Sequence, residues 1–345
     1  CSSDLSKGDL IMRKILLTTT ALVALGSVSA VAADVSVGGN VRFRYQAWSD
    51  DVAAAGGTNN SSMVDMVFLD VKASETTDSG LALSTRTRIR EGGGMDLNMI
   101  SVGGDFGTVT FGNQWNLSHL QQLSEASIAT VAGGGYVQAD TGTPMADMNS
   151  TGFLSNSDKD TKITYNLPSI GGFSAGVGFK DAGDASMANE TDMYARYVMP
   201  VGAGSLTINY SSLKTDEASN GASKSDDNEV GISYSSSFGR VYALALNEVD
   251  ETAAGKTVDQ QVNTYGVTYN VNDSLKALYW RVDNDEDGST NAGDTLSVDH
   301  FGVRYMIGGG LRFGVTHANH KFTDASNSAT NDSGSSTRAE LRMDF

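Results

Sequence analysis

Five arginines at alternate positions are the residues of this chain best placed to act on charged solutes. Arg42 and Arg44 lie in one segment, Arg86, Arg88 and Arg90 in a second, and Lys72 lies between them. In extended strands, alternate residues share one face about 7 Å apart, and neighbouring strands lie about 5 Å apart. If the three segments are neighbouring strands, their basic side chains form one patch.

Such a patch exerts a field on passing ions rather than covalent chemistry. Two unit charges about 10 Å apart interact by about 0.4 kcal/mol in water and about 1.7 kcal/mol at an effective dielectric of 20. This field biases ion flux severalfold and orients dipolar solutes, but it does not make a high-affinity site. The alternative is a generally polar, wetted face without a specific role.

A second set of residues follows the spacing of a calcium-binding loop. Its oxygen-bearing side chains are Asp283, Asp285, Asp287, Ser289, Asn291 and Asp294. Oxygen ligands at alternating positions, with a glycine at position 288, suit Ca²⁺. The usual terminal Glu is replaced by Asp, and a solvated acidic loop has the same composition. The pattern therefore predicts a weak calcium site and no required cofactor.

Other functions are disfavoured by the composition. Forty-one acidic residues face 24 basic ones, for a net charge of −17, so a nucleic-acid partner is not expected. The chain has four histidines, and none lies in a recognisable Ser/His/Asp arrangement; they are His119, His300, His317 and His320. We therefore expect no enzymatic activity.

The arginines belong to long segments of strict two-residue alternation. In residues 35–48 one face carries Val41, Phe43 and Tyr45, while the other carries Arg42 and Arg44. More than ten residues of this pattern are enough to cross a bilayer as a tilted strand. A soluble antiparallel sheet also alternates, but its strands are usually about half as long. Residues 81–90 and 337–345 repeat the pattern.

Short glycine-rich turns recur along the chain and set the number of strands. They begin at Thr76, Gly103, Pro168, Pro200, Ser235, Asn270 and Met306. Seven turns joining strands in pairs, with one strand at each end, predict about 16 strands. Long strands with short turns on one rim and longer loops on the other are typical of an all-β transmembrane antiparallel barrel. Residues 34–345 form this single domain.

The N-terminal segment has the features of an export signal. Residues 12–33 begin with Met, continue with Arg13 and Lys14, and then show a short apolar stretch and a small-residue cleavage region ending at Ala33. Residues 1–11, with Cys1, are expected to be an upstream remnant, since a complete leader follows them. We expect a cleaved signal peptide and a multi-pass protein of the bacterial outer membrane.

Several motifs together resemble the general porins of Gram-negative bacteria, especially those of alphaproteobacteria. They are KILLTTTALVAL in the leader, TTDSGL at 76–81, FGTVTFGNQ at 106–114, KITYNLPSIGGFSAG at 162–176 and the terminal Phe345. The resemblance implies a homotrimer of 16-stranded barrels. It also implies a long third loop, residues 115–155, folded into the lumen against the basic cluster, and its acidic residues are Glu125, Asp140 and Asp147. AGGGYVQAD at 132–140 replaces the acidic signature usual in the family.

The resulting functional prediction is a water-filled channel for passive diffusion of ions and small hydrophilic solutes, embedded among outer-membrane lipid and lipopolysaccharide. Two alternatives remain at this level: a solute-selective channel and a non-conducting structural barrel. Acidic loops enrich cations at the mouth and the arginines favour anions deeper inside, and we expect a mild cation preference overall.

Overall fold

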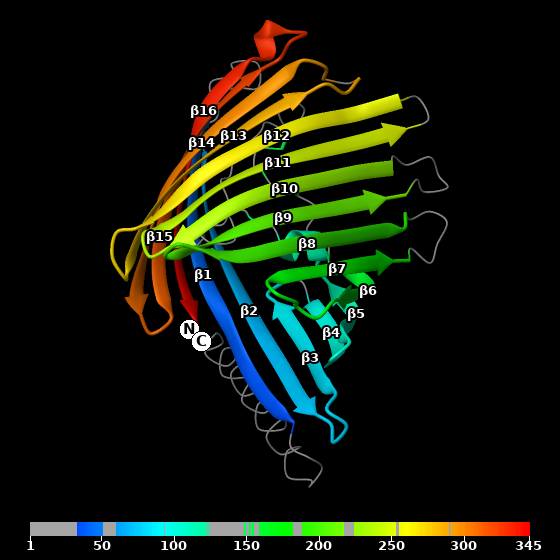
Figure 1. Cartoon of the computed structure of the whole chain (residues 1–345). Coiled ribbons are helices and arrows are strands. Elements are labelled where there is room, and N and C mark those ends of the chain that lie inside the picture. The colour runs from blue at the N-terminus through cyan, green and yellow to red at the C-terminus, as the bar shows by residue number, and fades with distance from the viewer. Residues whose placement is uncertain are drawn as a thin grey trace, which may run out of the picture.

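The computed structural model describes residues 33–50, 60–92, 94–121, 123, 148–149, 152, 154, 159–181, 188–216, 224–252, 255–289 and 291–345. Within this part of the chain, sixteen strands form one closed barrel (Figure 1). The strands are β1 (Asp34–Asp50), β2 (Asn60–Thr76), β3 (Ala82–Arg90), β4 (Gly94–Gly104), β5 (Gly107–Gln114), β6 (Asp160–Asn166), β7 (Phe173–Lys180), β8 (Glu190–Val201), β9 (Gly204–Thr215), β10 (Lys224–Ser236), β11 (Gly239–Thr252), β12 (Gly255–Asn270), β13 (Leu275–Glu286), β14 (Asp294–Gly308), β15 (Leu311–Thr323) and β16 (Asp332–Asp344).

Each strand pairs antiparallel with its neighbour in the chain, and β16 returns to β1 to close the wall. The closing register places Asn40 opposite Asp344. The backbone of Phe345 exchanges two hydrogen bonds with Gly39, of 2.9 and 3.1 Å. The predicted all-β antiparallel barrel of sixteen strands is confirmed. A closed wall leaves no unpaired strand edge. A membrane-spanning sheet needs this closure, because no water in the bilayer core can bond to free backbone groups.

The two faces of the wall differ as the alternation predicts. Large apolar side chains point outward and are exposed, including Phe43 (56%), Ile232 (46%), Tyr265 (45%) and Phe301 (47%). Neighbouring residues of opposite parity, such as Arg42 and Arg44, therefore face the interior. Among the residues that the structure describes, no helix has the length and apolar character needed to cross a membrane.

The strands are short on one side of the barrel, which we call the low wall, and long on the other, which we call the high wall. The neighbouring strands β3, β5, β6 and β7 have 9, 8, 7 and 8 residues, whereas β12 and β14 have 16 and 15. Figure 1 shows the long strands β8–β12 sweeping across the barrel and the short ones beside β3. In the part of the chain that the structure describes, two short helical segments, α2 (Leu117–Gln121) and η3 (Ser328–Thr330), lie between strands.

A buried apolar cluster lines part of the inner face. Its members come from β9 and from β11–β15, together with Met148 and Leu154 of the third loop. Val282 and Val298 are fully buried although the register turns them toward the lumen. Met148 and Leu154 of the third loop therefore pack against the inner side of these long strands.

Candidate functional site

The six basic residues predicted from sequence all lie on the inner face of β1–β3. In the β2–β3 register Lys72 lies opposite Arg86 and Asp70 lies opposite Arg88. Directly opposite residues of antiparallel strands project to the same face, so the two strands share one basic surface. Arg42 and Arg44 of β1 lie opposite Met66 and Val64 of β2, on that same face. The structure thus brings the predicted cations together.

Phe68 of β2, which the sequence analysis did not single out, lies at the centre of this group. The guanidinium carbons of Arg42, Arg88 and Arg90 lie 5.1, 4.9 and 5.6 Å from the centre of its ring. The ring is only 7% exposed. Cations within about 6 Å of an aromatic face are attracted by its quadrupole. We call Phe68, Arg42, Arg88 and Arg90 the Phe68 cluster.

Carboxylates neutralise some of these cations. Arg86 Nε donates to Asp70 Oδ1 at 2.7 Å, and Asp96 of β4 accepts hydrogen bonds from both Arg88 and Lys159. Trp115, at the start of the third loop, lies over the Arg88 guanidinium at 4.4 Å. Within the described residues, neither Arg42 nor Arg90 forms an ion pair; Arg42 Nε donates instead to the amide oxygen of Asn40 at 2.9 Å.

Barrel closure extends the basic surface to β15 and β16. Arg342 lies opposite both Arg42 of β1 and Arg312 of β15, so three arginines form a row across three strands. Asp344 accepts ion pairs from Arg312 and Arg342, each at 2.7 Å. The alternation of residues 337–345 places Arg342 on the inner face, and this signal is present in the sequence. The row itself can be recognised only once β16 is known to pair with β1.

A second ion pair crosses the same seam. Arg44 donates to Glu340 Oε2 through Nε at 3.1 Å and through a terminal nitrogen at 2.9 Å. The Glu340 side chain is fully buried, and the Arg44 side chain is 14% exposed. On the inner face of the described β1–β3, β15 and β16 nine Arg and Lys side chains gather, and four carboxylates form ion pairs with members of this group. The basic residues are Arg42, Arg44, Lys72, Arg86, Arg88, Arg90, Arg312, Arg338 and Arg342, and the carboxylates are Asp70, Asp96 (on β4), Glu340 and Asp344. Asp332 of β16 lies on the same face and pairs with His320.

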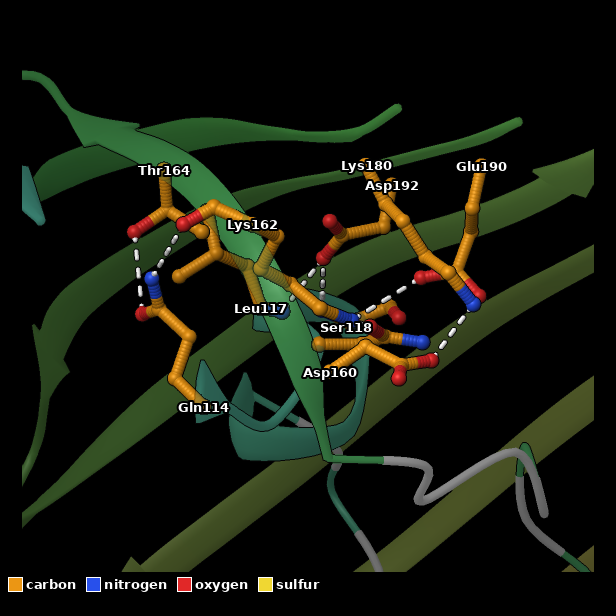
Figure 2. A network of polar contacts seen from close by, with 10 residues as sticks. Gln114, Leu117, Ser118, Asp160, Lys162, Thr164, Lys180, Glu190 and Asp192 are labelled. Carbon is orange, nitrogen blue, oxygen red and sulfur yellow. Dashed lines mark hydrogen bonds and ion pairs between the residues drawn. The ribbon is translucent and has the colours of Figure 1, made fainter. Parts of the chain in front are cut away.

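The third loop begins at a buried polar network on the low wall (Figure 2). The Asp192 carboxylate of β8 accepts hydrogen bonds from the backbone N–H groups of Leu117 and Ser118, the first residues of α2. Lys162 of β6 donates to Asn116 and, at 2.9 Å, to Glu190. A carboxylate that accepts the free N–H groups of a first helical turn fixes that end. The network therefore anchors the start of the loop to the wall.

The returning part of the loop is held on the inner face of β12 and β13. Asn149 donates its backbone N–H to Gln260 of β12 at 2.8 Å and accepts from Asn284 of β13 at 3.2 Å. Thr264 Oγ1 donates to the Gly152 carbonyl at 2.8 Å. The described ends of the loop thus contact one stretch of the inner face, on β8, β10, β12 and β13. Glu125, Asp140 and Asp147, the predicted acidic residues of the loop, lie outside the described residues.

One loop histidine is perturbed by its surroundings. His119 of α2 lies near Trp115, with ring centres 6.3 Å apart. Burial lowers the pKa of His119, and the positive charge of Lys159 lowers it further. The neutral imidazole is therefore the form that this environment favours.

The predicted calcium ligands are not gathered by the structure. Strand β13 continues to Glu286, so Asp283 and Asp285 are spaced along its outer face, and Asp283 pairs with Arg281 at 2.8 Å. Asp294 lies opposite Glu286 on the inner face and is buried. Asp287, Ser289 and Asn291 lie in the connection between the two strands. Within the described residues, no group of three or more His, Cys, Asp or Glu side chains is arranged to hold a metal ion. An extended strand spreads alternate ligands instead of curling them round an ion.

Comparisons with known proteins agree with this architecture. A family model described as Gram-negative porin matches residues 18–334. No curated protein matches the chain by sequence. The fold is similar to the anion-selective porin from Comamonas acidovorans, with a TM-score of 0.70, 18% identity, and coverage of 91% of this chain and 100% of that one. It is also similar to OmpT of Vibrio cholerae (0.67, 14%, 92% and 99%) and to a mutant porin of Rh. blastica (0.57, 16%, 90% and 100%).

Proposed function

The chain belongs to the Gram-negative porin family, and we propose that its pore is narrowed between the inner-face arginines and the third loop. The barrel is an outer-membrane channel for passive diffusion of solutes. Family and fold point to a channel rather than to an enzyme. Ions and small hydrophilic molecules pass through the water between the arginines and the third loop. The size of a solute limits its passage more than binding to the wall does.

The observation that carries the constriction is the attachment of the described residues of the third loop to the inner side of the wall. Asp192 holds its start near β8, and Gln260 holds Asn149 on β12. Glu229 of β10 also accepts the backbone N–H of Leu154, so the described contacts of the loop follow the inner wall from β8 to β13. We infer that the loop takes up space in the lumen beside this part of the wall. Trp115 of the same loop lies over Arg88, so the loop starts within contact of the basic surface.

We also propose that the channel is a homotrimer and that a cleaved signal peptide directs its export. A similar structure, OmpT of Vibrio cholerae folded in vitro, is described as a trimer form. Outward apolar side chains on the low wall, Ile100, Phe111 and Ile163, are 59%, 46% and 49% exposed and need cover from lipid or a neighbouring barrel. Mass spectrometry of protein extracted from outer membranes tests cleavage after Ala33.

Single-channel recording in a planar bilayer tests the channel and its constriction. We expect stepwise openings in groups of three with conductance nearly linear in salt concentration. The variant Trp115→Ala, which shortens the loop side chain over Arg88, should raise the conductance of each step. A folded barrel that conducts no current would contradict the channel and favour a structural barrel. Unchanged conductance in Trp115→Ala would contradict the constriction.

A further inference from the structure

Two limbs of the third loop meet at one carboxylate of the inner wall. Glu229 of β10 accepts a hydrogen bond from the backbone N–H of Leu154 at 3.4 Å, and the backbone N–H of Leu123 is a second donor to it. Leu123 lies on the outgoing limb, just after α2, whereas Leu154 lies on the limb that returns toward β6. Glu229 is fully buried, so these bonds are shielded from water.

The wall holds Leu123 by its backbone on both sides and by its side chain. Its N–H donates to Glu229, and its carbonyl oxygen accepts a hydrogen bond from Arg240 of β11 at 3.2 Å. Its side chain lies against Gly231 of β10, where an added Cβ would lie 2.9 Å from Leu123 Cδ1. Glycine therefore leaves room for the leucine at this point of the strand. Leu123 is 3% exposed as a result.

Leu154 is fixed on the same stretch of wall. It is fully buried in the apolar cluster of the inner face, and the Gly152 carbonyl beside it accepts a hydrogen bond from Thr264. One side chain, Glu229, thus joins two distant points of the loop. Such a contact divides a long loop into shorter segments, and the entropic cost of holding a segment closed grows with its length.

The described bond to Glu229 uses one of its two carboxylate oxygens. Oε2 accepts from Leu154, whereas Oε1 is buried without a hydrogen-bond partner among the described residues. A glutamine at this position keeps a carbonyl oxygen in the place of Oε2. A leucine has a similar size but no acceptor, and it leaves buried N–H groups without a partner. The two substitutions therefore separate the hydrogen bonds from the charge.

We propose that Glu229 is the positioning residue that joins the outgoing and returning limbs of the third loop, and that this clasp sets the largest solute that the channel admits. Gly231 and Arg240 complete the clasp by holding Leu123. A loop whose limbs are joined keeps one shape, so the passage beside it excludes solutes above a sharp size. This inference rests on the proposed function, because it needs a pore narrowed by the loop.

The uptake of uncharged sugars of increasing size into liposomes that contain the refolded protein tests the size limit. Uncharged sugars are chosen because the charges of the wall do not steer them. We expect Glu229→Leu to admit a trisaccharide severalfold faster than the parent protein does, with the uptake of a pentose little changed. Glu229→Gln should follow the parent protein.

Amide hydrogen exchange provides a direct readout of the clasp. The amides of Leu123 and Leu154 should lose protection in Glu229→Leu and keep it in Glu229→Gln. Gly231→Val gives the same test without a change of charge, because its side chain fills the space of Leu123. It should admit the trisaccharide faster as well, and it serves as the test where Glu229→Leu does not fold. Heat-dependent mobility in detergent gels checks the folding of each variant.

Asp250→Asn is the matched control for charge. Asp250 lies on β11 beside the clasp, and within the described residues its carboxylate makes no hydrogen bond to the third loop. This variant should keep the size limit of the parent protein. Folded Glu229→Leu and Gly231→Val barrels with an unchanged size limit would overturn the inference, and so would equal effects of leucine and glutamine at position 229. A parent protein that admits no sugar would instead overturn the proposed channel.

Discussion

Substitution of Glu340 is a simple way to change the charge of the pore. Its side chain is fully buried and accepts both Arg44 bonds, so Glu340→Gln keeps the shape and deletes one negative charge. We expect the chloride-to-potassium permeability ratio to rise and the barrel to lose about 1–3 kcal/mol of stability, since a charged hydrogen bond is weakened. Reversal potential and thermal unfolding measure the two effects. A move toward cations would contradict the inward position of the pair.

His119 makes the stability of the start of the third loop sensitive to acid. Because burial lowers its folded pKa below the unfolded value of about 6.5, protonation favours the unfolded segment. The stabilisation is complete above that unfolded value and is lost as the pH falls toward the folded pKa. Limited proteolysis of the third loop in detergent-solubilised protein should therefore become faster below pH about 6.5. His119→Gln, which cannot titrate, should remove this pH dependence; a persistent dependence would assign it to other groups.

At the residue scale, the sequence identified the arginines that share a strand face but not the ring among them. Arg86, Arg88 and Arg90 are two residues apart, and strand periodicity alone places them together. Nothing in the sequence distinguishes Phe68 from other aromatic residues of the strands, because its contact with Arg42 depends on the register between β1 and β2. The row through Arg342 depends on barrel closure, which joins the two ends of the chain.

At the element scale, Gly152 allows the returning part of the third loop to reach the high wall. Its φ is +74°, and an added Cβ would lie 2.1 Å from Thr264 Oγ1 and 2.7 Å from a Val282 methyl group. Gly152→Val should therefore push this part of the loop off the wall, at a cost of about 1–3 kcal/mol.

The consequence for the channel is a less steady passage. We expect the open current of Gly152→Val to fluctuate more than that of the parent protein, with the sixteen-stranded wall still intact. Gly309→Ala is a suitable control, because Gly309 also has a positive φ (59°) but nothing lies within 4 Å of an added Cβ there. Equal current noise in the parent protein and in Gly152→Val would contradict the role of this contact.

The alternation predicted strands well where water or arginine fills the inner side and poorly where the loop covers it. Tyr242, Leu278 and Trp280 face inward yet are buried with Leu154, so their strands carry apolar residues on both faces. Sequence alone cannot separate such a strand from one of undefined facing. Spacing alone likewise does not reveal that β13 continues to Glu286, which places Asp283 and Asp285 along an extended strand.

At the scale of the whole molecule, the acidic surplus of the chain and the basic patch on the inner face of β1–β3 act on ions in opposite directions. The closed wall separates the arginines of β1–β3 from the outward side chains, and the pairing of β16 with β1 brings Arg342 beside Arg42. Charges on loops at the mouth raise the local concentration of cations, whereas the inner arginines act on each ion during passage. Net charge is therefore a poor guide to selectivity in a barrel.

Salt concentration separates these two contributions. The screening length is about 10 Å at 0.1 M and about 3 Å at 1 M, so charges at the mouth fade first and exposed pore charges follow. If the Phe68 cluster decides the sign, the chloride-to-potassium ratio measured across salt gradients of fixed ratio should stay above one at every concentration and shrink toward one at high salt. If the acidic mouth decides it, dilute salt should favour potassium. Because Arg42 and Arg90 lie within contact of one ring inside the wall, we expect the first result, and a crossover to potassium at low salt would assign selectivity to the loops.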